Sequence, residues 1–130
     1  MTTIREAMER AKGELEGHTF KVDIRSYWND YTLHVRVIGV RDNGIYNQVE
    51  CSLKGDFRRC NIGSGALESL ERVVALELWP HPSSYQGIME PGKPLKKPYY
   101  SLRYRGVEEE GSDPRRLLED FFREYPGAFF

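Results

Sequence analysis

Apolar residues near the amino end recur at the spacing of a helix. They are Ile4, Ala7, Met8, Ala11 and Leu15, and charged residues fill the opposite face. Thr3 and Glu6 have the spacing of a capping box, in which the threonine hydroxyl accepts from the glutamate amide. The pattern predicts a helix that begins after Thr3 and ends at Gly13 and Gly17.

The pattern then changes to the two-residue alternation of strands. It predicts one strand at about His18–Trp28 and a second at Tyr31–Arg41, joined by a two-residue Asn29-Asp30 turn. The resulting pairs are Val22 with Val37, Ile24 with Val35, Ser26 with Leu33, and Asp23 with Arg36. One face of this hairpin is apolar and the other is charged, which makes the register consistent with a single buried face.

A third strand is expected after a three-residue Asp42-Asn43-Gly44 loop, with Gly44 in the left-handed region. This loop pairs Val37 with Val49, Val35 with Cys51, Leu33 with Leu53, and Arg36 with Glu50. A second turn at Lys54–Phe57 would return the chain as a short strand, Arg58 to Ile62. Cys51 would then lie directly opposite Cys60.

A second helix is expected after Gly63-Ser64-Gly65, with Ser64 as its cap. Its buried stripe would be Ala66, Leu67, Leu70, Val73, Val74 and Leu78. Prolines dominate 80–98 and predict an extended surface connector. Tyr99 to Arg105 alternates like a strand, with Tyr100, Leu102 and Tyr104 on one face. Asp113-Pro114 predicts the start of a last helix, which carries Leu117, Leu118, Phe121, Phe122 and Tyr125 and stops at Pro126-Gly127.

These elements predict an α+β fold in a single domain. Residues 1–79 would form an α-β-β-β-α core, in which an antiparallel sheet of about four strands packs on helices. The connector 80–98 would lead to a strand–helix extension at 99–130 that packs on this core.

Composition indicates a soluble intracellular protein. The chain has 130 residues, of which 39% are hydrophobic and 30% charged, and its net charge is -1. No apolar run reaches the length of a membrane span, no secretory leader is visible, and two cysteines are too few for a disulfide scaffold. Residues 80–105 carry a net charge of +4 and 106–130 carry -4, two stretches that can neutralise each other.

Motifs of catalysis are missing from the sequence. His18, His34 and His81 show no zinc spacing with the cysteines, and no nucleophile or phosphate-loop motif is present. We therefore expect no enzyme activity, no metal and no cofactor. Gly63-Ser64-Gly65 is read as a helix cap rather than as an anion site. Cys51 and Cys60 are either two free thiols, with Cys60 made more reactive by Arg58 and Arg59, or a disulfide.

One basic, tyrosine-containing segment is a candidate for contacts with nucleic acid or a partner. It contains Lys93, Lys96, Lys97, Tyr99, Arg103 and Arg105, and Arg58 and Arg59 are added from the predicted hairpin. Tyrosine rings can stack on bases while cations hold phosphates. A structural strand with a basic rim explains the same residues.

The element order resembles that of the double-stranded RNA-binding domain, and Tyr31–Val37 is similar to its second strand. The resemblance covers residues 3–79. It implies RNA held through the first helix, the loop after the first strand and lysines at the start of the second helix. Here Leu67, Glu68 and Glu71 take the place of those lysines, and acids repel phosphate.

We therefore expect a non-enzymatic binding module that acts through protein–protein contact or self-association. The alternatives are RNA binding, through 93–105 or through the face that the resemblance implies, and a small viral or phage inhibitor.

Overall fold

The computed structural model describes residues 2–25, 29–59, 68–81, 92 and 94–129. Its elements, in chain order, are α1 Ile4–Leu15, β1 Thr19–Arg25, β2 Asn29–Asp42, β3 Asn47–Arg59, β4 Glu68–Pro80, β5 Tyr100–Tyr104, β6 Val107–Gly111 and α3 Pro114–Glu124, followed by a 3-10 turn, Pro126–Phe129. The six strands form one antiparallel sheet in the order β1-β2-β3-β4-β5-β6. The fold is α+β, as the sequence predicts, but the sheet is larger than the expected four strands.

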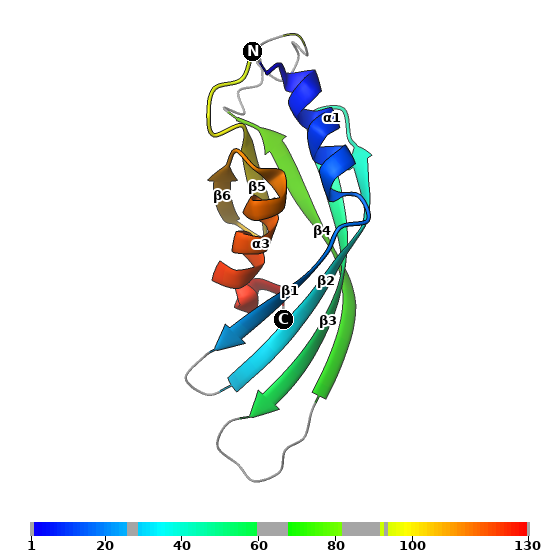
Figure 1. Cartoon of the computed structure of the whole chain (residues 1–130), viewed down its shortest axis with the longest axis vertical. Helices are drawn as coiled ribbons and strands as arrows, with labels where there is room; N and C mark the ends of the chain where they lie inside the picture. Colours follow the sequence, from blue (N-terminus) through cyan, green and yellow to red (C-terminus); the bar gives the residue numbers. More distant parts are fainter. Residues whose placement is uncertain (1, 26–28, 60–67, 82–91, 93, 130) are drawn as a thin grey trace.

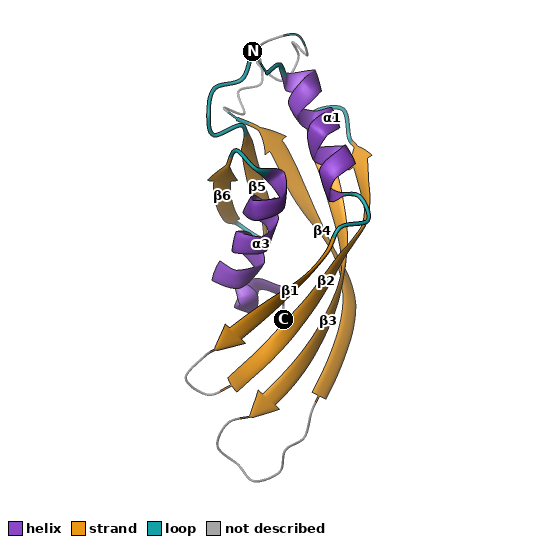
Figure 2. Ribbon diagram, viewed as in Figure 1, coloured by secondary structure: helices purple, strands orange, loops and turns teal. Residues whose placement is uncertain are grey.

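Both helices lie on the same side of the curled sheet, side by side (Figures 1 and 2). The core between them contains apolar side chains from all strands except β6 and from both helices, including Val22, Leu33, Leu76, Phe121 and Phe122. Residues of 1–79 and of 99–130 thus share one core, which makes the chain a single small domain.

Helix α1 begins as the sequence predicts. The Thr3 hydroxyl accepts from the amide of Glu6 at 3.2 Å. Two buried polar side chains hold the helix on the sheet: the Tyr100 hydroxyl donates to the carbonyl of Ala7 at 2.7 Å, and Asn47 donates to the carbonyl of Met8 at 3.0 Å. Because both donors are buried, each would be costly to leave without an acceptor.

The first hairpin has the expected faces but a different register. Val22 lies opposite Leu33 and Phe20 opposite Val35, so each expected pairing is displaced by four residues. The strand β2 begins at Asn29, inside the expected turn. An even displacement leaves every side chain on its face, so the apolar pattern alone could not distinguish the two registers.

The second hairpin combines a longer loop with a β-bulge. Asp42 pairs with Asn47 across a four-residue loop, and Gly44 has the expected positive φ, 86°. A four-residue loop alone would turn Val37 away from the core. The register shift between Val37 and Gly39, with Ile38 as the additional residue, restores it to the inner face. Val37 therefore lies opposite Cys51 rather than Val49.

The expected turn at Lys54–Phe57 is wrong, because β3 continues through it to Arg59. Cys51 lies between Val37 and Val74, so the expected hairpin that placed Cys60 opposite it does not form. Cys60 itself lies outside the described residues. Pairing with a strand on each side outweighs the local turn preference of Gly55, which is buried in the sheet.

The expected second helix is also wrong where the structure describes it, since Glu68–Pro80 is the strand β4. Val74, Leu76 and Leu78 are buried and alternate with exposed or half-buried neighbours. The same apolar residues fit a helical stripe, but only a strand can fill the sheet position between β3 and β5. Ser64, Ala66 and Leu67 lie outside the described residues.

The carboxyl-terminal elements follow the prediction, with one addition. The strand at 100–104 and the helix after Asp113-Pro114 are confirmed, and Asp113 accepts from the amides of Arg115 and Arg116. The added strand, β6, follows a two-residue turn in which Arg105 and Gly106 have φ of 48° and 80°, values typical of a type I′ hairpin. Most of the expected connector 80–98 lies outside the described residues.

Candidate functional site: the open face of the sheet

The side of the sheet opposite α1 and α3 is covered by neither helix. We call its part on β1–β4 the open face. Its outward residues are Thr19, Lys21, Asp23 and Arg25 on β1, Thr32, His34, Arg36 and Ile38 on β2, Gln48, Glu50, Ser52 and Lys54 on β3, and Glu71, Val73, Ala75 and Glu77 on β4. Its mixed chemistry makes this face a candidate surface for contact.

One row of side chains crosses all four strands. Lys21 lies opposite His34, His34 opposite Lys54, and Lys54 opposite Glu71. A hollow of about 640 Å³ lies along this row. Adjacent strands are about 4.8 Å apart, so the row spans about 14 Å. The row begins with the basic Lys21 on β1 and ends with the acidic Glu71 on β4, so the charge changes sign across the strands.

The centre of the open face is apolar. Val73 on β4 is 57% exposed and Ile38 on β2 is 49% exposed, and Ala75 is also exposed. The bulge turns Ile38 outward between the buried Val37 and Val40. Bulges commonly redirect a side chain toward a function, and apolar side chains that gather on an exposed face are a signal of a contact surface.

Charges on either side of this centre are separated by strand. On the outward side of β2, His34 and Arg36 precede Ile38 along the strand and Arg41 follows it. On the outward side of β4, Glu71 precedes Val73 and Glu77 follows Ala75. Only Arg41 among these has an ion-pair partner described on the face, at 3.5 Å from Glu50. The face therefore has a basic strand and an acidic strand, with β3 between them.

An aromatic stack closes one end of the sheet's outer side. The ring of Trp79 stacks on that of Tyr46 with centroids 4.7 Å apart, and the guanidinium of Arg103 lies 4.8 Å from the Trp79 ring. Arg103 also forms an ion pair with Glu108 at 3.4 Å. Trp79 donates to Glu77 at 3.0 Å. This end is thus held together by contacts within the chain.

The structure does not gather the predicted basic segment into one surface. Lys96 and Lys97 are exposed beside half-buried Tyr99, with the Lys97 ammonium 6.0 Å from its ring. Arg103 is occupied by Trp79 and Glu108, and Arg105 is exposed at the β5–β6 turn, 5.3 Å from the Tyr104 ring.

Three further predicted site residues are described only in part or not at all. Lys93 lies outside the described residues. Arg58 and Arg59 belong to β3, at the end farthest from β5, and their side chains are not described. They follow Leu53 on an extended strand that pairs with β2 and β4 only, so β4 and most of the length of β3 separate them from the basic segment.

Sequence reasoning missed the open face because it placed a helix where β4 runs. Val74, Leu76 and Leu78 recur at every second position, and this spacing was the signal that could have indicated a strand. Glu68 and Glu71, the acids expected on a helix in place of RNA-binding lysines, lie on the strand β4. The described residues therefore do not reproduce the order of elements on which the RNA-binding resemblance rests.

The cysteine that the structure describes, Cys51, is buried. Burial, and secondarily the Glu50 carboxylate, raises the pKa of the Cys51 thiol to about 12. A thiol that stays protonated at neutral pH is a poor nucleophile. No group of three or more histidine, cysteine or acidic residues among the described residues could hold a metal ion.

None of the helices that the structure describes is long and apolar enough to cross a membrane. Comparison of the chain with protein-family models, with curated proteins and with solved structures finds no significant match.

Proposed function

We propose that the protein is a non-enzymatic binding module that associates with a second copy of itself through the open face. The observation that carries this proposal is the pair of outward apolar side chains at its centre, Ile38 and Val73. Association would remove both from water. Full burial of a side chain of this size contributes about 1.5–3 kcal/mol, and because each of the two is already about half buried, association gains about half of that for each.

The opposite charges on β2 and β4 favour a second copy as the occupant. A twofold axis along β3 would place the outward side of β2 on that of β4 from the other copy. Arg41 would then face Glu77, His34 would face Glu71 and Ile38 would face Ala75, while Arg36 would face Val73 and lie diagonal to Glu71. Such an arrangement is isologous, since the same residues meet in both directions.

Sedimentation equilibrium, from low micromolar concentration to about 0.2 mM, tests the proposal. The expected result is a reversible monomer–dimer equilibrium. Val73→Asp should weaken the dimer by about tenfold or more, because an unpaired carboxylate would be buried. Glu9→Lys on the exposed side of α1 is the matched surface control and should leave the equilibrium unchanged.

A charge exchange tests the arrangement itself. His34→Glu and Glu71→Lys should each weaken the dimer, and the double variant should recover affinity, because opposite charges again face each other across the axis. A monomer at every concentration would overturn the proposal. A dimer that ignores Val73→Asp, or a double variant no better than the singles, would overturn it as well.

A further inference from the structure

Strand β6 ends the sheet, and among the described residues it pairs with β5 alone. The hairpin fixes which of its backbone groups are used. Tyr104 and Val107 close a two-residue turn and form a hydrogen-bonded pair. Pairs alternate along an antiparallel ladder, so Glu109 and Gly111 also bond to β5. The amides and carbonyls of Glu108 and Glu110 therefore point outward along the edge.

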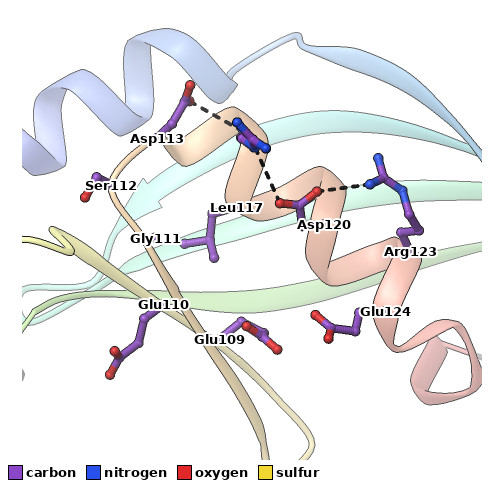
Figure 3. A pocket seen from close by; sticks show the side chains of 10 residues that line it. Glu109, Glu110, Gly111, Ser112, Asp113, Leu117, Asp120, Arg123 and Glu124 are labelled. Carbon is purple, nitrogen blue, oxygen red and sulfur yellow. Dashed lines mark hydrogen bonds and ion pairs between the residues drawn. The ribbon is translucent and has the colours of Figure 1, made fainter.

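A groove runs beside this edge, between β6 and the outer side of α3 (Figure 3). Its volume is about 440 Å³. Glu109 and Glu110 line it from the strand, and Leu117, Asp120, Arg123 and Glu124 line it from the helix. A strand added to β6 would lie against this groove, with every second side chain directed into it.

The groove carries carboxylates in excess of its cations. Asp120 is paired with Arg123 at 3.3 Å and with Arg116 at 3.8 Å. Among the residues that the structure describes, no cation forms an ion pair with Glu124 or Glu109. Their mutual hydrogen bond, and then their repulsion, raises the pKa of Glu124. Glu109 also accepts from the Tyr125 hydroxyl at 2.7 Å.

We propose that the edge of β6 binds an extended segment of another protein as a seventh strand, with a lysine or arginine of that segment directed into the groove between Glu109 and Glu124. The backbone of Glu108 and Glu110 supplies hydrogen bonds to the added strand, which is the source of affinity in strand addition. The carboxylates supply specificity for a basic side chain.

The same acids exclude the most obvious competitor, the β6 edge of a second copy. Two edges that each carry Glu108, Glu109 and Glu110 repel each other, and charged edge strands are a common way to prevent edge-to-edge pairing. A basic strand meets attraction in place of that repulsion. The site is also separate from the open face of β1–β4, so it does not depend on the proposed self-association.

The probe is a fluorescein-labelled peptide of alternating lysine and valine, seven residues long, with an alternating glutamate–valine peptide as its counterpart. Fluorescence anisotropy at physiological salt should show binding of the basic peptide only. Glu110→Pro removes one outward amide and is tolerated at an edge position. Glu110→Thr is the matched control, because it loses the same carboxylate and its contact with His81 but keeps the amide.

We expect Glu110→Pro to weaken the basic peptide by about tenfold or more, and Glu110→Thr by about threefold or less. Glu124→Gln should weaken it without affecting the fold, since its side chain is exposed. Addition of peptide to the unsubstituted protein should slow amide exchange at Glu108 and Glu110. This last measurement decides the matter if the proline variant fails to fold.

Equal binding by the proline and threonine variants would overturn strand addition, as would unchanged exchange at the two amides. Equal binding of the acidic peptide would overturn the specificity. Val73→Asp, which should break the dimer, is expected to leave peptide binding unchanged. Loss of peptide binding in that variant would show that the two surfaces are one, and would overturn a separate edge site.

Discussion

The buried hydroxyl of Tyr100 joins the sheet to α1, and its removal has an effect that depends on pH. The ring is fully buried and its hydroxyl donates to the carbonyl of Ala7 at 2.7 Å. Tyr100→Phe removes that bond and keeps the ring. A net hydrogen bond of this kind contributes about 0.5–1.5 kcal/mol, so at neutral pH we expect the free energy of unfolding to fall by about 1 kcal/mol.

At alkaline pH the Tyr100→Phe variant should become more stable than the unsubstituted protein. Burial is the main cause that raises the pKa of Tyr100 from 10.0 to about 12. The unfolded chain then loses this proton above pH 10, while the folded chain retains it to about pH 12. The stabilisation is fully present below pH 10 and is lost between pH 10 and 12. A shift of two units corresponds to about 2–3 kcal/mol, which is more than the neutral cost of the substitution.

Urea denaturation at pH 7, 10 and 11, followed by tryptophan fluorescence, measures both effects. The unsubstituted protein should lose stability more steeply above pH 10 than Tyr100→Phe does. Tyr99→Phe is the matched control, because it removes a hydroxyl from the adjacent, half-buried ring. If Tyr100→Phe and the unsubstituted protein lose stability in parallel from pH 10 to 11, the reasoning about the buried hydroxyl is refuted.

Three further changes test the turns, the cap and the helix contact, each by urea denaturation. Gly44 has φ of 86°, so Gly44→Val should cost about 1–2 kcal/mol and Gly44→Asn much less; equal costs would contradict the loop geometry. Asp113→Ala should lower the free energy of unfolding by about 1 kcal/mol, because the Asp113 carboxylate accepts from two amides at the start of α3. An unchanged urea midpoint would show that this cap does not stabilise the protein. At Gly111 an added Cβ would lie 3.2 Å from Leu117, so Gly111→Ala should lower the free energy of unfolding by about 1–3 kcal/mol. Gly13 has open space around it, so Gly13→Ala should instead stabilise α1 by up to about 1 kcal/mol. The opposite ranking of the two glycines would show that α3 moves freely on β6.

Local chemistry was sufficient to predict the start of both helices and the positive φ at one turn. Thr3 and Asp113 were identified as caps from residue type and spacing, and both accept the expected amides. Gly44 was assigned a positive φ from its place in a turn sequence, and it has one. These features depend on contacts between residues close in sequence, so the sequence contains the whole interaction.

Patterns with a single interpretation also located elements correctly. Alternation at Tyr100, Leu102 and Tyr104 predicted a strand with that buried face, and the first two are fully buried while Tyr104 stacks on Phe129. The apolar spacing in α1 and α3 predicted helices that the structure contains. In these segments only one regular structure places all apolar residues on one side.

Pairing between distant segments could not be predicted from such patterns. The register of β1 on β2 differs by four residues from the expected one, and both registers bury the same side chains. The loop and the bulge of the second hairpin compensate each other at Ile38. Faces repeat every two residues along a strand, so hydrophobicity alone leaves such alternatives equal.

Only the tertiary structure decided the state of Glu68–Pro80, and with it the candidate surface. Val73, Val74 and Leu78 satisfy a helical stripe as well as a strand, and the sequence contains no pattern that excludes either. The strand form prevails because β3 pairs with β4 from Glu68 to Leu78, and β5 pairs with Glu77–Pro80 on the other side. The open face and the continuation of β3 past Gly55 both follow from that pairing, which joins residues too far apart for local sequence to specify.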